Sequence, residues 1–341
     1  MNEKLAGALV GFGGVAEHAH LPAYQHHPSA ELRAVAEPDA DARARAREAT
    51  GGSIRVYANI GELLACERLD FVDIAAPPSE HLDAIEHAAR GGVHVLVEKP
   101  LALTRREAER AQRAAERAGT ALMTVHNWHH APSFRAARAA LGSGSVGVPK
   151  EIEFSTERTE PAGGTGSWRL DMKIAGGGIL MDHGWHQIYL ARALLGGCDP
   201  RSVRAVTECR RWTDGSVEDT ADCRIHFMGD AFAHLRLSWA APARRTSVTI
   251  RGDSGSLRID GSNVTVVTAA GPERPWPVEH NEPDDSYHAS WFPRVLDAFI
   301  EAVEDPTRAA ANRREAMVCQ AVLAAAYCSS DRAGAEVVVE L

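Results

Sequence analysis

Short apolar runs alternate with amphipathic stretches through the first third of the chain. The apolar runs lie at residues 5–10, 32–36, 54–57, 71–76, 93–97 and 121–125. The stretches between them, such as 39–49 and 105–118, read as helices rich in alanine and charged residues. Runs of valine, leucine and isoleucine are typical of parallel strands buried on both faces. The alternation therefore predicts an α/β fold with a doubly wound parallel sheet.

Capping residues mark several of these helices. Asn59, Ser79 and Thr104 are candidate N-caps, and Glu107 follows Thr104 by three residues as in a capping box. Gly119 stands where the helix after Thr104 should end.

The pattern changes after about residue 127. Residues 150–156 and 201–268 alternate apolar and polar positions, with Gly229-Asp230 and Gly252-Asp253 as turns, which predicts a mostly antiparallel sheet. Helical patterns lie at 134–141, 287–304 and 312–328, and a further helix that carries Asp182 and His186 runs to about residue 195. We expect an N-terminal dinucleotide-binding domain over 1–126 and a second, substrate-binding and oligomerisation domain over 127–341. The last helices could pack back on the first domain.

Composition excludes several classes of protein. The net charge is −9, which argues against nucleic acid and an anionic membrane surface as partners. Apolar runs stay well below the roughly 20 residues of a membrane span. The N-terminus enters a strand pattern without signal-peptide architecture, and the six cysteines are scattered. We therefore expect a cytoplasmic protein with reduced thiols.

A glycine-rich turn joins the first strand to the first helix. It is a G-x-G-x-x-A motif made by Gly11, Phe12, Gly13, Gly14, Val15 and Ala16. Such a turn lets the backbone approach a pyrophosphate at a helix N-terminus. Glu37 follows the second strand, where dinucleotide folds place the acid that binds the ribose hydroxyls. A carboxylate there repels a 2′-phosphate, so the sequence favours NAD over NADP; the alternative is a strand-end charge.

Another strand, residues 93–97, ends in Glu98-Lys99-Pro100. The carboxyl ends of parallel strands share one edge, outside which ligands bind. Lys99 should therefore lie near the glycine turn, Glu37, Pro77 and Asn127. Taken alone, Glu98 and Lys99 could equally be solvated loop charges.

A second group of polar residues follows three consecutive glycines, residues 176–178. Asp182 and His186 are four apart, so they share one helix face, which Tyr189 extends. His186 could carry a proton near neutral pH, and Asp182 could hold a substrate hydroxyl or orient the histidine. The alternative is a solvated helix face. A metal is not expected, because neither His183 with these residues nor the histidines at 126, 129 and 130 have zinc-site spacing.

Together these motifs resemble the glucose–fructose oxidoreductase, inositol dehydrogenase and rhizopine-catabolism (Gfo/Idh/MocA) family. The residues that carry the resemblance are Gly11-x-Gly13-x-x-Ala16, Ala36-Glu37-Pro38-Asp39, Ile74-Ala75-Ala76-Pro77 with His81, Glu98-Lys99-Pro100, Gly176-Gly177-Gly178, Asp182-x-x-x-His186 and Ala325-Ala326-Tyr327-Cys328-Ser329. They span nearly the whole chain in the family's order. The resemblance implies a Rossmann domain, then an α/β domain on an open, largely antiparallel sheet that commonly makes the oligomer contact, here a homodimer or homotetramer.

The resemblance also implies roles. Lys99 would stabilise negative charge on the reacting oxygen, His186 would exchange the hydroxyl proton, and Asp182 would bind a neighbouring hydroxyl. Glu98 and Asn127 would contact the nicotinamide side, and Pro77 and His81 the adenosine half or the phosphates. The Lys99–Pro100 bond would be cis.

The sequence departs from the family after Asn127, where arginines are common. Here Trp128 and His129 follow, which favours a neutral substrate over a phosphorylated or carboxylated one. Further candidate substrate residues are Trp168, Arg169 and His183. The expected function is NAD-dependent hydride transfer on a sugar, inositol or related polyol. The alternatives are an NAD-dependent glycosidase of the same fold and a non-catalytic sugar or dinucleotide sensor.

Overall fold

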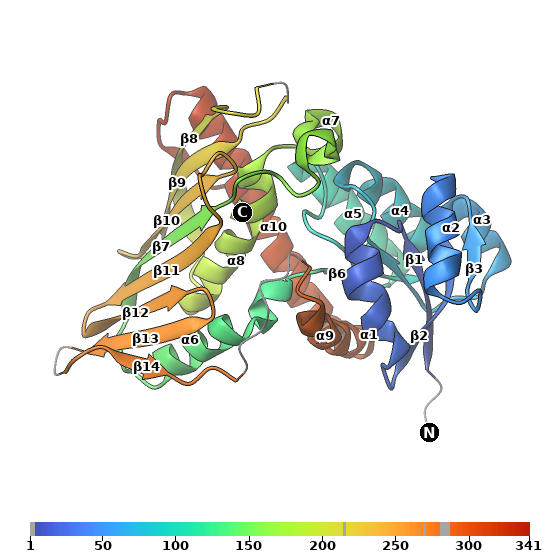
Figure 1. The fold of residues 1–341 in the computed structure, drawn as a ribbon, viewed down its shortest axis with the longest axis horizontal. Helices are drawn as coiled ribbons and strands as arrows, with labels where there is room; N and C mark the ends of the chain where they lie inside the picture. Colours follow the sequence, from blue (N-terminus) through green and yellow to red (C-terminus); the bar gives the residue numbers. More distant parts are fainter. Residues whose placement is uncertain (1–3, 214–215, 269–270, 280–286) are drawn as a thin grey trace. The chain divides into compact units, whose positions relative to one another are not determined.

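The computed structural model describes residues 4–213, 216–268, 271–279 and 287–341. The chain divides into two compact units (Figure 1). The first unit comprises Met1–Asn127 and Asp284–Ala316, and the second comprises Trp128–Pro283 and Met317–Leu341. The helix α10 (Pro306–Asp331) contributes residues to both units.

A six-stranded sheet forms the centre of the first unit. Its strands are β1 (Leu5–Val10), β2 (Ala30–Ala36), β3 (Arg55–Tyr57), β4 (Phe71–Ile74), β5 (His94–Val97) and β6 (Leu122–Thr124). The strand order is β3-β2-β1-β4-β5-β6 and each neighbouring pair is parallel. The chain changes direction across the sheet between β1 and β4, the position where open α/β sheets bind ligands. The predicted doubly wound parallel sheet is confirmed.

Helices cover both faces of this sheet. They are η1 (Ala16–His20), α1 (Leu21–Gln25), α2 (Ala40–Ala49), α3 (Ile60–Cys66), α4 (Pro78–Arg90), α5 (Arg105–Ala118), η6 (Ala289–Trp291) and α9 (Phe292–Glu304). Leu9 packs in a cluster with α2, whereas its neighbour Ala8 packs in another with α3. Successive strand residues point to opposite faces, so these clusters lie on the two sides of β1.

Side-chain caps begin helices where the sequence predicted them, with one exception. Asn59 accepts the backbone N–H of Glu62, and Thr104 accepts that of Glu107. The predicted cap at Ser79 is wrong, because α4 begins one residue earlier. Pro78 can occupy the first helical position, having no N–H to satisfy.

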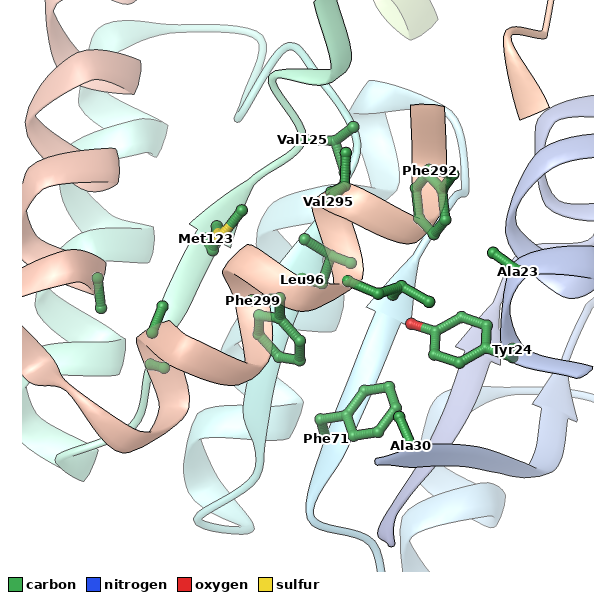
Figure 2. Close-up of a cluster of buried hydrophobic side chains, with 14 residues drawn as sticks. Ala23, Tyr24, Ala30, Phe71, Leu96, Met123, Val125, Phe292, Val295 and Phe299 are labelled. Carbon is green, nitrogen blue, oxygen red and sulfur yellow. The ribbon is translucent and has the colours of Figure 1, made fainter. Parts of the chain in front are cut away.

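The largest described core cluster lies between the sheet and α9 (Figure 2). Phe299 of α9 meets Phe71 of β4 edge to face, with ring centroids 5.5 Å apart. Tyr24 of α1 stacks on the other side of Phe71 at 5.8 Å. Each such aromatic pair adds roughly 1 kcal/mol beyond the burial of its apolar area. Residues from near the C-terminal end of the chain thus complete the core of the N-terminal sheet.

The second unit contains a nine-stranded sheet in the order β14-β13-β12-β11-β7-β10-β9-β8-β15. The strands are β7 (Pro149–Glu157), β8 (Pro200–Glu208), β9 (Thr220–Phe227), β10 (Phe232–Ser238), β11 (Arg245–Gly252), β12 (Gly255–Asp260), β13 (Asn263–Thr268), β14 (Arg274–Trp276) and β15 (Val337–Val338). Only β7 and β10 are parallel among the described pairs, so the mostly antiparallel sheet is confirmed. The sequence analysis did not find β14 and β15, which are too short to show a pattern.

Helices lie against one face of this sheet. Contacts with the strands come from α6 and α8 (Figure 1). The helical segments are η2 (Asn127–His130), α6 (Pro132–Gly142), η3 (Gly164–Gly166), η4 (Trp168–Leu170), α7 (Met172–Ala175), η5 (Leu180–Gly184) and α8 (Trp185–Leu194). The strands alternate buried and partly exposed side chains, as in Ile152 and Phe154 against Glu151 and Glu153. Among the helices described in either unit, each falls short of the length or apolar character that crossing a bilayer requires.

Candidate active site

The glycine turn of the first unit has a backbone that only glycine can adopt at its start. Gly11 has φ +91°, and a Cβ there would lie 2.7 Å from the backbone nitrogen of Ala76. Gly13 is exposed, and a Cβ on it would meet no atom within 4 Å. Glu17 donates its N–H to the carbonyl of Gly13, so the helix starts directly after the turn. Its first N–H groups have no partner within the helix, so they are of the kind that binds an anion such as a phosphate.

Glu37 lies directly after β2 and is buried. One carboxylate oxygen accepts the N–H of Phe12 at 2.7 Å, and the other accepts that of Asp39 at 2.8 Å. Glu37 therefore ties the end of β2 to the glycine turn. Each oxygen retains a lone pair for a further donor, such as a ribose hydroxyl. The sequence analysis missed Arg43, which donates to the backbone carbonyls of Glu37 and Pro38.

The loop after β5 carries Glu98, Lys99 and Pro100. The Lys99–Pro100 peptide bond is cis, as the resemblance implied. Glu98 accepts the backbone N–H of Lys99 with Oε2 at 3.1 Å. The side chain of Glu98 is 16% exposed, so it is not a solvated loop charge.

The structure adds a buried partner of Glu98, His20, and a second carboxylate that His20 contacts, Asp73; neither was found from the sequence. His20, on η1, has Nε2 3.2 Å from Oε1 of Glu98 and Nδ1 2.9 Å from Oδ2 of Asp73. Asp73 lies on β4 and also accepts the hydroxyl of Tyr24 at 3.0 Å. Burial lowers the pKa of His20, but attraction and hydrogen bonds from Asp73 and Glu98 outweigh it and raise that pKa to about 9.

The pKa of Glu98 moves in the opposite direction. Burial raises it, but the hydrogen bond and charge of His20, together with the charge of Lys99, outweigh burial and lower it below the ordinary glutamate value. Glu98 is therefore a carboxylate at neutral pH. A signal for this cluster was present in the sequence, since an aspartate inside a buried strand requires a partner.

Three more predicted residues lie after strands of this sheet, at or near the starts of α4 and η2. His81 is fully buried, and its ring nitrogens lie 2.9 Å from the carbonyls of Pro100 and Ala76. It therefore links the start of α4 to the loop of the cis peptide, while Pro77 precedes α4. Asn127 follows β6, and its buried Oδ1 has no hydrogen-bond partner among the described residues. An orphaned acceptor at this edge fits the amide group of a nicotinamide.

In the second unit, the predicted glycine triplet is explained by close packing. A Cβ on Gly178 would lie 1.8 Å from the backbone oxygen of Glu218, and one on Gly177 would lie 2.0 Å from the hydroxyl oxygen of Tyr327. The Glu218 carboxylate accepts the N–H of Gly178 at 2.9 Å and of Leu180 at 3.0 Å. Tyr327 donates its hydroxyl to the same carboxylate at 2.9 Å. Glu218, which the sequence analysis missed, thus fixes the loop that leads into η5.

His186 is 6% exposed, so this helix face is not solvated. Its Nδ1 lies 2.9 Å from the hydroxyl of Tyr189, which also accepts the backbone N–H of Trp128 at 3.1 Å. The rings of Trp128 and His186 have centroids 5.5 Å apart, and those of His129 and Tyr189 4.6 Å. Four aromatic and imidazole rings, from η2 and α8, therefore form one cluster.

Asp182 lies on η5, one turn before His186. Its Oδ2 is 3.7 Å from Nε of Arg169, and the Arg169 guanidinium stacks over the ring of Trp168 at 4.4 Å. His183, also on η5, is half-buried. The structure thus brings Asp182, Arg169 and Trp168 together within the second unit, as a charge pair backed by an aromatic ring.

Comparison with known proteins identifies both parts of the chain. Residues 5–126 match the oxidoreductase family with an NAD-binding Rossmann fold, and residues 134–258 match the GFO/IDH/MocA C-terminal domain. The D-apiose dehydrogenase of Paraburkholderia graminis is 30% identical over 290 residues, which cover 80% of this chain and 75% of that protein. The D-glucoside 3-dehydrogenase of Escherichia coli is 26% identical and covers 97% of this chain and 96% of that protein.

A solved structure is similar over the full length. GenD2 from gentamicin A biosynthesis, in complex with NAD, has a TM-score of 0.86 at 28% identity and covers 100% of this chain and 98% of that chain. The relatives are dehydrogenases, and the N-terminal match is to an NAD-binding Rossmann domain. The chain therefore belongs to the Gfo/Idh/MocA family of oxidoreductases and is an NAD-dependent dehydrogenase or reductase.

Proposed function

We propose that the protein transfers a hydride between NAD and a secondary alcohol or ketone of a sugar, inositol or related polyol. The observation that carries the proposal is the set of groups at the carboxyl edge of the first unit's sheet. The glycine turn with its exposed Gly13, Glu37, Lys99 and the orphaned amide oxygen of Asn127 all follow strand ends there. The names of the relatives support a sugar-like substrate, since they include D-apiose and D-glucoside dehydrogenases.

Lys99 and His186 are the proposed acid–base pair. NAD, when bound, supplies the hydride acceptor or donor at its nicotinamide ring. The ammonium of Lys99 would stabilise negative charge on the substrate oxygen and lower the pKa of the alcohol. His186 would take the hydroxyl proton at Nε2 during oxidation and return it during reduction.

Tyr189 is proposed to set the orientation of His186. Its oxygen lies 2.9 Å from Nδ1 and accepts a backbone N–H as well. A phenolic oxygen can accept two hydrogen bonds. Nδ1–H can therefore donate to Tyr189, which would leave Nε2 as the atom that exchanges the proton.

The substrate is proposed to be polyhydroxylated. Asp182 would accept a substrate hydroxyl next to the reacting one, and Arg169, 3.7 Å from it, would donate to another oxygen. Trp128 and Trp168 offer apolar faces of the kind that pack on the C–H side of a sugar ring. His129 and His183 remain candidate contacts on the same elements.

NAD is the proposed cofactor in preference to NADP. Glu37 places a buried carboxylate after β2, where it would repel a 2′-phosphate. The guanidinium of Arg43 is already engaged by the carbonyls of Glu37 and Pro38. The purified protein should therefore bind NAD with higher affinity than NADP. Replacing Glu37 by alanine should reduce this difference in affinity.

The decisive experiment combines a substrate screen with two variants. Polyols, inositols and sugars are tested for NADH formation, and turnover is then measured for Lys99→Ala and His186→Ala. Each variant should lose about 10²- to 10⁴-fold in kcat, the usual contribution of a general acid or base, while still binding NAD. Matched controls are Lys150→Ala and His87→Ala, which lie on exposed or half-exposed surface. Near wild-type turnover in either test variant would reject the pair.

Product analysis separates the alternative chemistries. Net NADH formation on a free polyol supports the proposal. Release of an aglycone without net NADH would indicate a glycosidase, and NAD binding without any turnover would indicate a sensor. A cytoplasmic location and a homodimer or homotetramer through the open sheet of the second unit stay predictions, the latter to be checked by light scattering.

A further inference from the structure

A continuous row of polar groups runs from the interior of the first unit to Lys99. Tyr24 donates to Asp73, Asp73 faces Nδ1 of His20, and Nε2 of His20 faces Glu98. Glu98 in turn accepts the backbone N–H of Lys99. These groups come from α1, β4, η1 and the loop after β5, so separate parts of the fold converge on one imidazole.

Both ring nitrogens of His20 face carboxylates, an arrangement that an imidazolium satisfies. Each of its nitrogens lies within hydrogen-bond distance of a carboxylate oxygen, at 2.9 Å and 3.2 Å. A neutral imidazole donates from one nitrogen only, whereas an imidazolium donates from both. His20 and Asp73 are both 0% exposed, so an unpaired carboxylate here would carry a large desolvation cost. Charges therefore alternate along the row, from Asp73 through His20 and Glu98 to Lys99.

We propose that His20 is a positioning residue for hydride transfer: it holds Glu98 as a fixed carboxylate beside Lys99. This inference rests on the proposed function, because it concerns the residue next to the proposed catalytic lysine. Glu98 keeps its charge because His20 compensates it, and Glu98 then provides a constant counter-charge for the Lys99 ammonium. The chemistry of the site thus depends on a histidine that lies beneath it.

Few other groups face this histidine. The titratable or charged groups around it among the described residues are Asp73 on β4, Tyr24 on α1, Glu98 after β5 and Lys99 beside Glu98. From α9, the ring of Phe292 stacks on His20 with centroids 3.8 Å apart and 22° between the planes, and it carries no charge. Loss of His20 therefore removes the main cation that faces Glu98.

The experiment is a pH profile of four proteins: the wild type, His20→Asn, Glu98→Gln and the double variant. Between pH 5 and 8, the kcat/KM of the wild type should show no pH dependence that arises from ionisation of Glu98. In His20→Asn, Glu98 loses its partner and protonates at higher pH, so kcat/KM should acquire an acid limb in addition to the one that protonation of His186 gives in every variant, with a further fall of about tenfold per pH unit. Glu98→Gln and the double variant should lack this limb, because the titrating carboxyl is absent.

The matched control is His27→Asn. His27 is also buried in the first unit and pairs with a carboxylate, Asp297, at 3.2 Å. It should lose stability without gaining the acid limb. A purely structural role for His20 predicts that His20→Asn behaves as His27→Asn does, and that result would overturn the inference.

Failure of the proposed function is distinguishable from failure of this inference. If the wild type oxidises no polyol, the same four profiles are measured for NAD binding, and the acid limb should appear in His20→Asn alone.

If His20→Asn does not fold, the imidazole of His20 is followed by NMR in protein labelled with ¹⁵N-histidine. Glu98→Gln should then lower the ionisation midpoint of His20 by about one pH unit, and an unchanged midpoint would contradict the inference.

Discussion

Each unit has a buried glutamate next to the side chains that we propose to be reactive, and the two glutamates have opposite electrostatics. Glu98 in the first unit faces cations, His20 and Lys99, which outweigh burial and lower its pKa. Glu218 in the second unit faces neutral donors, two backbone N–H groups and the Tyr327 hydroxyl. Burial raises its pKa, and the hydrogen bonds only partly oppose that shift. A glutamate therefore provides a negative charge in the first unit, whereas in the second unit a glutamate holds the conformation of a backbone loop.

This difference determines which substitutions should matter in each unit. In the first unit, the proposed support for Lys99 is electrostatic, so pH and charge should change it. In the second unit, the support for Asp182 and His186 is the packing of a glycine loop against Glu218 and Tyr327, so side-chain volume should change it. Each prediction below tests one side of this contrast.

The largest effect is expected from Gly178→Ala. The new Cβ would lie 1.8 Å from the backbone oxygen of Glu218. Either the glycine loop or the segment before β9, which contains Glu218, must therefore move. We expect a loss of about 4 kcal/mol in the free energy of unfolding and a fall in turnover, because the loop that leads to Asp182 and His186 is displaced. Urea unfolding and kcat measure the two effects.

Its control is Gly142→Ala. Gly142 ends α6, has no positive φ, and a Cβ on it would meet nothing within 4 Å. Stability there should change by less than about 1 kcal/mol. If Gly178→Ala were equally mild, the loop would owe its shape to something other than close packing.

A smaller effect, dependent on pH, is expected from His20 in the first unit. Its pKa is raised from 6.5 to about 9, so its contribution to stability is fully present below pH 6.5 and is lost as the pH rises through 9. The shift corresponds to on the order of 3 kcal/mol. Urea unfolding of the wild type between pH 6.5 and 9.5 should show this loss, and His20→Asn should show a flatter dependence. Parallel curves for the two proteins would mean that His20 is not held as an imidazolium.

Local patterns were sufficient to predict the parallel sheet, the glycine turn and the motif at Glu98. The strands of the first unit are short, mostly apolar runs, and the glycine turn lies between adjacent elements. The information for each is contained in a few consecutive residues. The predicted roles of Lys99, Asp182 and His186 stay predictions, because each depends on a bound substrate.

The supporting residues could not be predicted in this way. His20 is 53 residues from Asp73 and 78 from Glu98, and Gly178 is 40 residues from Glu218. No periodic pattern links positions so far apart in the chain. Gly177 and Gly178 make room for Tyr327 and Glu218, which the glycine triplet alone does not indicate. Sequence spacing indicates that a backbone must be approached closely, but it does not identify the group that approaches.

The smallest effect is expected from Tyr327→Phe, which removes one donor from Glu218 and leaves the ring in place. Loss of this hydrogen bond should lower stability by about 1 kcal/mol. Amide hydrogen exchange over residues 178–184 should accelerate, because Glu218 accepts the N–H groups of Gly178 and Leu180 and would be held less firmly. The control is Tyr57→Phe, which removes a similar hydroxyl–glutamate contact in the first unit and should leave that exchange unchanged.

Combining Tyr327→Phe with Gly177→Ala sharpens the test, since the new Cβ would lie 2.0 Å from the Tyr327 oxygen. If packing governs this loop, Gly177→Ala should lower the free energy of unfolding by less in the Tyr327→Phe protein than in the wild type. An equal loss of stability in the two proteins would show that the Tyr327 hydroxyl does not restrict residue 177. Packing would then not be what distinguishes the second unit from the electrostatic support in the first.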